Sequence, residues 1–136
     1  MFYVINHLNR LCSKPLLPIT GINTYLSTID PKKFKQHVDY NELEPKRKLL
    51  YMNDKFALQT IGFLPGQYLT KQYYDPFNVF FTVLRGELAE TVYIKNDTYY
   101  YTHRRHSGRF INDDIANHSL SNRTRRVTGL LVLYVI

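Results

Sequence analysis

The sequence predicts a mainly β protein, a small β-barrel of short strands preceded by short helices. Short runs rich in β-branched and aromatic residues, separated by turn signals, follow one another from residue 47 onward. The runs at 79–84 and 130–135 are apolar at consecutive positions. Such runs indicate strands that are covered on both faces, as in a closed barrel with a packed flank.

The first 45 residues predict short helices. Ile5, Leu8 and Cys12 recur at helical spacing and share one face of a helix. Asp30 directly before Pro31 is typical of a helix start, because an aspartate caps free backbone amides and proline suits the first helical position. The predicted helices are 5–12, 21–28 and 32–38.

The remaining residues predict eight strands. Turn signals such as Asn53-Asp54, Pro65-Gly66 and Asn96-Asp97 separate them. We expect one domain over residues 1–136, with a helical N-terminal part at 1–45 and the barrel at 46–136. The predicted strands are about 48–52, 57–63, 79–84, 90–94, 98–102, 108–111, 118–121 and 127–135.

Composition favours a soluble cytoplasmic protein. The chain has 136 residues, of which 44% are hydrophobic and 21% charged, as is ordinary for one globular domain. One cysteine excludes an internal disulfide and fits a reducing compartment. No apolar run approaches the roughly 18 residues of a membrane-spanning helix, and residues 1–5 are too short for a secretion signal. We therefore expect cytoplasmic localisation and no membrane partner.

The net charge of the chain is +7, and six of its arginines lie in one stretch, Arg104–Arg126. A basic face of this kind can bind phosphate or an acidic partner, and the alternative is a solvated loop surface. His103 lies directly before this stretch and His106 lies within it, and we expect both on a loop surface. The arginines are Arg104, Arg105, Arg109, Arg123, Arg125 and Arg126.

Two segments carry the most specific pattern in the chain. Residues 80–91 contain Gly86-Glu87-Leu88, and residues 110–118 end in His118 and are followed by Asn122. Together they resemble the cysteine dioxygenase (thiol dioxygenase) family of the cupin superfamily. The resemblance extends over roughly residues 47–134, about two thirds of the chain. It implies a cupin-type jelly-roll barrel with helices packed at its N-terminal side.

The resemblance also implies an altered metal site. Enzymes of this family hold Fe(II) with three neutral imidazoles and leave positions for a thiolate and dioxygen. His118 matches one ligand, but the family's His-x-His falls on Gln72 and Tyr74. A glutamine oxygen is a weak ligand, and a tyrosine is protonated near neutral pH. We therefore expect no cofactor, with Fe(II) bound only if the site functions.

Two substrate-side positions of the family are retained. Arg47 matches the arginine that pairs with the substrate carboxylate, a task suited to its bidentate guanidinium. Tyr134 matches the tyrosine whose hydroxyl faces the iron, so it would be catalytic only in an active enzyme. Val79 falls where some members carry a cysteine crosslinked to that tyrosine. The alternatives are a solvated Arg47, a core Tyr134 and a structural His118.

Three hypotheses follow. The leading one is a cysteine-dioxygenase-like cupin with a degraded iron site, a pseudoenzyme that binds a small carboxylate or amino acid or acts as a regulator. The second is a divergent non-haem iron oxidoreductase, a thiol dioxygenase that oxidises cysteine or a related thiol. The third is a basic interaction module that binds nucleic acid or an acidic partner through Arg104–Arg126. The sequence does not specify the oligomeric state.

Overall fold

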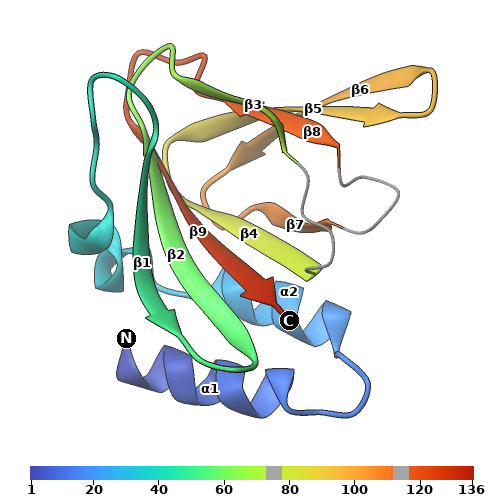
Figure 1. The fold of residues 1–136 in the computed structure, drawn as a ribbon. Coiled ribbons are helices and arrows are strands. Elements are labelled where there is room, and N and C mark those ends of the chain that lie inside the picture. The colour runs from blue at the N-terminus through green and yellow to red at the C-terminus, as the bar shows by residue number, and fades with distance from the viewer. Residues whose placement is uncertain (73–77, 112–116) are drawn as a thin grey trace.

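Two helices and nine strands make up the described part of the chain (Figure 1). The computed structural model describes residues 1–72, 78–111 and 117–136. The elements are α1 (Phe2–Cys12), α2 (Ile19–Thr28), the 3₁₀ turns η1 (Pro31–Lys33) and η2 (Lys35–His37), β1 (Lys46–Met52), β2 (Phe56–Phe63), β3 (Tyr68–Gln72), β4 (Asn78–Arg85), β5 (Glu87–Ile94), β6 (Asp97–Arg104), β7 (Gly108–Ile111), β8 (His118–Ser121) and β9 (Thr128–Val135).

The strands form two sheets that face each other across a barrel. One sheet has the order β1-β2-β9-β4-β7, and the other has the order β3-β8-β5-β6. An isolated parallel bridge between Val83 and Arg105 links the two sheets along one side. Helices α1 and α2 cover the outer face of the five-stranded sheet (Figure 1). The predicted mainly β barrel with N-terminal helices is therefore confirmed.

The hydrophobic core has two parts, one on each face of the five-stranded sheet. The outer part joins the helices to the sheet and includes Leu131 and Leu133 of β9. The inner part fills the barrel and includes Leu130 and Val132, with Tyr134 packed against it. Side chains alternate between the two faces of a strand, so β9 contributes to both parts. This confirms the prediction that its apolar run is covered on both faces.

The third predicted helix, 32–38, is wrong in type. The structure has two 3₁₀ turns there, although Asp30 accepts a hydrogen bond from the Lys32 amide at 3.0 Å, as expected of a cap. Phe34 lies between the turns and is fully buried. A segment this short gains little from cooperative α-helix formation. The burial of the Phe34 ring therefore determines the course of the backbone here.

One strand was missing from the prediction. Strand β3 contains exposed Tyr68 and Thr70, and Leu69 between them is only partly buried. Its amphipathic signal is therefore weak, and its pairing with β8 places it in the sheet. The other eight strands occur where predicted, with ends that differ by at most three residues.

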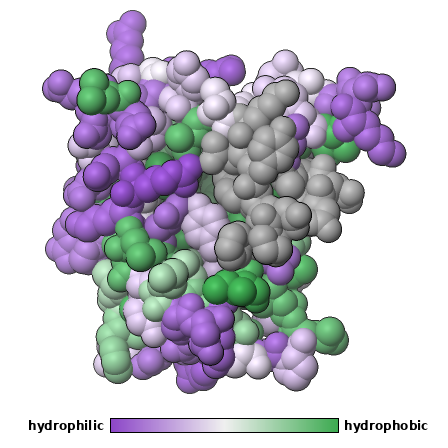
Figure 2. Space-filling view, viewed as in Figure 1, coloured by the Kyte–Doolittle hydropathy of each residue, from purple (hydrophilic) through white to green (hydrophobic). Residues whose placement is uncertain are grey.

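Hydrophilic side chains dominate the upper half of the face in Figure 2, and hydrophobic ones gather lower down, around α1 and the β1–β2 hairpin. The exposed hydrophobic residues in these elements include Phe2, Tyr3, Leu49 and Met52. No helix in the described ranges is long and apolar enough to span a bilayer.

Candidate functional site

A buried carboxylate, Glu90, lies at the centre of a polar cluster inside the barrel. The residue is 1% exposed. Its Oε2 lies 2.6 Å from Nδ1 of His118, and its Oε1 lies 2.8 Å from Nε2 of His103. The guanidinium of Arg109 reaches the same carboxylate, with Nε 2.9 Å from Oε1. We call these four residues the Glu90 cluster.

The strand register explains how the cluster assembles. Leu88, Glu90 and Val92 are the buried, inward positions of β5. His103 on β6 is paired with Leu88, and His118 on β8 is paired with Val92. Glu90 therefore has one histidine diagonally on each side, a separation that long side chains bridge.

The environment keeps Glu90 ionised. Burial by itself raises the pKa of a carboxyl group. Hydrogen bonds from His103 and His118 and the charge of Arg109 outweigh burial and lower the pKa of Glu90 to about 2. The carboxylate therefore acts as a hydrogen-bond acceptor on both sides, and both imidazoles donate to it.

Two predictions for the arginine-rich stretch need correction. His103 is 6% exposed and bonded to Glu90, so it does not lie on a loop surface, whereas His106 is exposed. Arg109 turns inward, with its guanidinium 4.0 Å from the centre of the Tyr101 ring. Its Nε makes no hydrogen bond to any described residue, although it is 2.9 Å from Glu90, so that contact is an ion pair without good alignment.

The other five arginines of the stretch are exposed and on the surface. Arg104 pairs with the half-exposed Glu87, with Nε 3.3 Å from Oε2. An acidic or nucleic-acid partner for this surface stays a prediction. The exposed arginines are Arg104, Arg105, Arg123, Arg125 and Arg126.

Arg47 and Tyr134, which lie 87 positions apart, are in contact. Nη1 of Arg47 donates to the Tyr134 hydroxyl at 3.3 Å, and Nε2 of Gln59 donates to the same oxygen at 2.6 Å. Burial raises the pKa of Tyr134, and the Arg47 charge offsets part of that rise. Val79 is directly opposite Tyr134 in the β4–β9 pairing. The structure thus brings both predicted substrate-side residues to one place.

The predicted metal positions are brought together only in part. His118 on β8 is fully buried, and in the pairing of β8 with β3 its backbone partner is Gln72. Tyr74 lies outside the described residues. In the ranges the structure describes, no three His, Cys, Asp or Glu side chains form a metal-binding group. At the three predicted positions the structure describes one imidazole, that of His118, whereas the iron site implied by the resemblance uses three, so we derive no iron chemistry from this arrangement.

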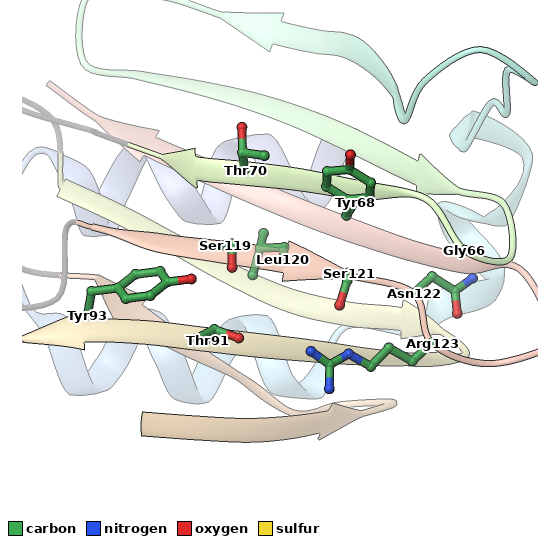
Figure 3. Close-up of a pocket in the computed structure, with 10 residues that line it drawn as sticks. All are labelled: Gly66, Tyr68, Thr70, Thr91, Tyr93, Ser119, Leu120, Ser121, Asn122 and Arg123. Carbon is green, nitrogen blue, oxygen red and sulfur yellow. The ribbon is translucent and has the colours of Figure 1, made fainter. Parts of the chain in front are cut away.

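A separate groove of about 720 Å³ lies on the outer face of the four-stranded sheet (Figure 3). Hydroxyl side chains from three adjacent strands line it, and Arg123 is its one cationic lining residue among those described. The described lining of the groove includes no carboxylate, histidine or cysteine at which a proton or an acyl group could be transferred. The hydroxyl residues are Tyr68, Thr70, Thr91, Tyr93, Ser119 and Ser121.

Sequence reasoning missed Glu90 and His103. A signal was available for Glu90, because it stands at an inward position between Leu88 and Val92 in an otherwise alternating strand. A charged residue at such a position is rarely buried without partners. For His103 there was no such signal, since most of β6 is exposed.

Comparison with known proteins supports the fold. No family model and no curated protein matches the chain. Among solved structures, TT1209 from Thermus thermophilus matches with a TM-score of 0.66 and 18% identity, over 79% of this chain and 97% of that one. A cupin superfamily protein from Desulfitobacterium hafniense matches with a TM-score of 0.58 and 14% identity, over 72% and 83%. An oxalate oxidase bound to the substrate analogue glycolate matches with a TM-score of 0.61 and 14% identity, over 70% and 52%.

These structures share the fold of this chain. Identities of 14% to 18% carry no information on activity, so the likeness is one of architecture. The two facing sheets with N-terminal helices are a cupin fold, also called a double-stranded β-helix.

Proposed function

We propose that this protein is a cysteine-dioxygenase-like cupin that binds a small carboxylate or amino acid without iron-dependent catalysis. The contact between Arg47 and Tyr134 is the observation that supports this most directly. An exposed guanidinium beside a phenol hydroxyl offers a carboxylate both charge and a hydrogen-bonding neighbour.

The position of Val79 supports the alignment behind this proposal. In the resemblance, Val79 takes the place of a cysteine that some family members crosslink to the tyrosine at Tyr134. The two residues are paired across β4 and β9. A crosslink requires such closeness, so the register agrees with the assignment of Tyr134.

The test is calorimetric titration of the purified protein with cysteine and a panel of small carboxylates. We expect binding of one of them to weaken about tenfold or more in Arg47→Gln, because a charge-assisted hydrogen bond to the ligand is lost. Lys46→Gln is the matched control, since it removes an exposed charge from the adjacent residue. Equal affinities in both variants contradict the proposal.

Elemental analysis and dioxygen uptake with cysteine separate this function from the thiol dioxygenase alternative. We expect sub-stoichiometric iron and no uptake above background. One iron per chain that disappears in His118→Ala, together with dioxygen consumption, supports the enzyme and overturns the non-catalytic proposal.

A further inference from the structure

A second polar cavity lies far from the contact between Arg47 and Tyr134. It has a volume of about 250 Å³ and adjoins Arg85, the last residue of β4. Val79, which is opposite Tyr134, lies six positions earlier in the same strand. Six residues of strand span roughly 20 Å, so the two places are separate.

Four cationic side chains from separate segments line this cavity. Lys32 and Lys35 come from the two 3₁₀ turns, Arg85 from the end of β4, and Arg105 from just beyond β6. The backbone bridge between Arg105 and Val83 fixes the last of these beside β4. No carboxylate is among the described lining residues.

Nearby acidic side chains do not neutralise these charges. Each ion pair found in the described ranges involves other cations. Glu87 is paired with Arg104, and Asp39 with Lys48. Asp30 caps the 3₁₀ turn that follows it. Within the described part of the chain, the four cations of the cavity therefore lack a paired carboxylate.

The remaining lining residues add a hydroxyl and an apolar wall. Tyr40 has a side-chain hydrogen bond with Arg85; burial raises the pKa of its hydroxyl, and the charge and hydrogen bond of Arg85 offset part of that rise. A phenol hydroxyl is protonated at neutral pH and can donate a hydrogen bond. Val38 and Leu84 form an apolar wall of the same cavity. Like charges that converge on one space repel each other, and a bound anion relieves that repulsion.

We propose that this cavity binds a small phosphorylated organic molecule. The four cationic side chains contact the phosphate oxygens, for which guanidinium and ammonium groups are suited donors. Val38 and Leu84 contact the organic part. The volume corresponds to about eight water molecules at roughly 30 Å³ each, which fits a small compound. A nucleic-acid strand instead requires a basic groove that tracks its backbone.

Titration with inorganic pyrophosphate tests the proposal. We expect one saturable site per chain in calorimetry at about 150 mM salt, where diffuse attraction is largely screened. Lys35→Gln and Arg105→Gln should each weaken binding about tenfold, the loss expected for one charge-assisted contact. Both residues are exposed, so both variants should fold, and thermal melting checks this.

Arg125→Gln is the matched control, because it removes the same charge from an exposed arginine outside the cavity. Its pyrophosphate affinity should stay within about twofold of the parent protein. Equal weakening in all three variants overturns the proposal and indicates diffuse attraction. Absence of saturable binding to the parent protein also overturns it. Tighter binding of a single-stranded oligonucleotide that is lost in Arg125→Gln favours a nucleic-acid surface instead.

Discussion

Nδ1 of His118 lies 2.6 Å from Oε2 of Glu90, and both side chains are closed off from solvent. The contact joins β8 to β5, and His103 extends it from the other carboxylate oxygen to β6. One carboxylate thus ties three strands of the four-stranded sheet. Because a buried charge is costly without partners, these contacts depend on one another.

Loss of the Glu90 charge should destabilise the protein strongly. We expect Glu90→Gln to lower the free energy of unfolding by about 3 kcal/mol, since it breaks a buried charge network. Guanidinium unfolding measures the change. Glu87→Gln is the control, because its pair with Arg104 is solvent-exposed and worth less than about 1 kcal/mol. Similar losses in the two variants would show that the Glu90 cluster contributes no more than a surface pair.

Stability should fall in acid because of the same carboxylate. The pKa of Glu90 is lowered from 4.5 to about 2. A lowered pKa gives stability that is present above the unfolded-state value and is lost as pH falls toward the folded-state value. We therefore expect a loss of about 3 kcal/mol between pH 4.5 and pH 2. Unfolding curves across this range should show a shallower decline in Glu90→Gln, and parallel declines would contradict the assignment.

Removal of the Tyr134 hydroxyl should lower the free energy of unfolding by less than the loss of the Glu90 charge does. Tyr134→Phe loses the hydrogen bonds from Gln59 and Arg47, and we expect a destabilisation of about 1 kcal/mol. Urea unfolding provides the measurement. Tyr100→Phe, at a position that is 72% exposed, should leave stability unchanged. An unchanged midpoint in Tyr134→Phe would mean that solvent replaces these bonds without loss.

Two glycine substitutions should have opposite signs. A Cβ at Gly62 would stand 2.0 Å from the backbone oxygen of Asp39, so we expect Gly62→Ala to destabilise the protein by about 2 kcal/mol or more. At Gly21 in α2 the nearest atom is Cβ of Pro18, at 3.6 Å. Alanine there should stabilise the protein by about 0.5 to 1 kcal/mol, because it favours the helix. Thermal melting compares the two: stabilisation by Gly62→Ala would contradict the close packing around Gly62, and destabilisation by Gly21→Ala would contradict the open space beside Gly21.

Restoring imidazoles should restore iron binding if the resemblance is correct. We expect the double variant Gln72→His, Tyr74→His to bind one Fe(II) per chain, since the resemblance then supplies the three imidazoles that the family's iron site uses. Elemental analysis after anaerobic loading measures it. Adding His118→Ala to that double variant should abolish binding. Iron that persists without His118, or no iron in the double variant, argues against the alignment.

The sequence was sufficient to predict the barrel, because its strands are apolar where both faces are covered and are bounded by clear turns. The sequence was insufficient to predict β3. Its exposed Tyr68 and Thr70 flank a residue that is only partly buried, so hydrophobic and polar residues do not alternate clearly, and its place in the sheet depends on pairing with β8. Through the family resemblance the sequence assigned Arg47 and Tyr134 separately to the substrate side of one site, and their direct contact is a finding of the structure. It did not yield the Glu90 cluster, because that cluster depends on a diagonal register between three strands.

The central position of β9 has a consequence for how the chain folds. Strand β9 lies between β2 and β4 in the described sheet and is paired with both of them. Phe56 is paired with Val135, 79 positions further along the sequence. Such non-local pairings require long loops to close before any contact stabilises them, which slows folding. We therefore expect slow refolding, limited by the docking of β9, with β2 and β4 aggregation-prone until their shared partner arrives.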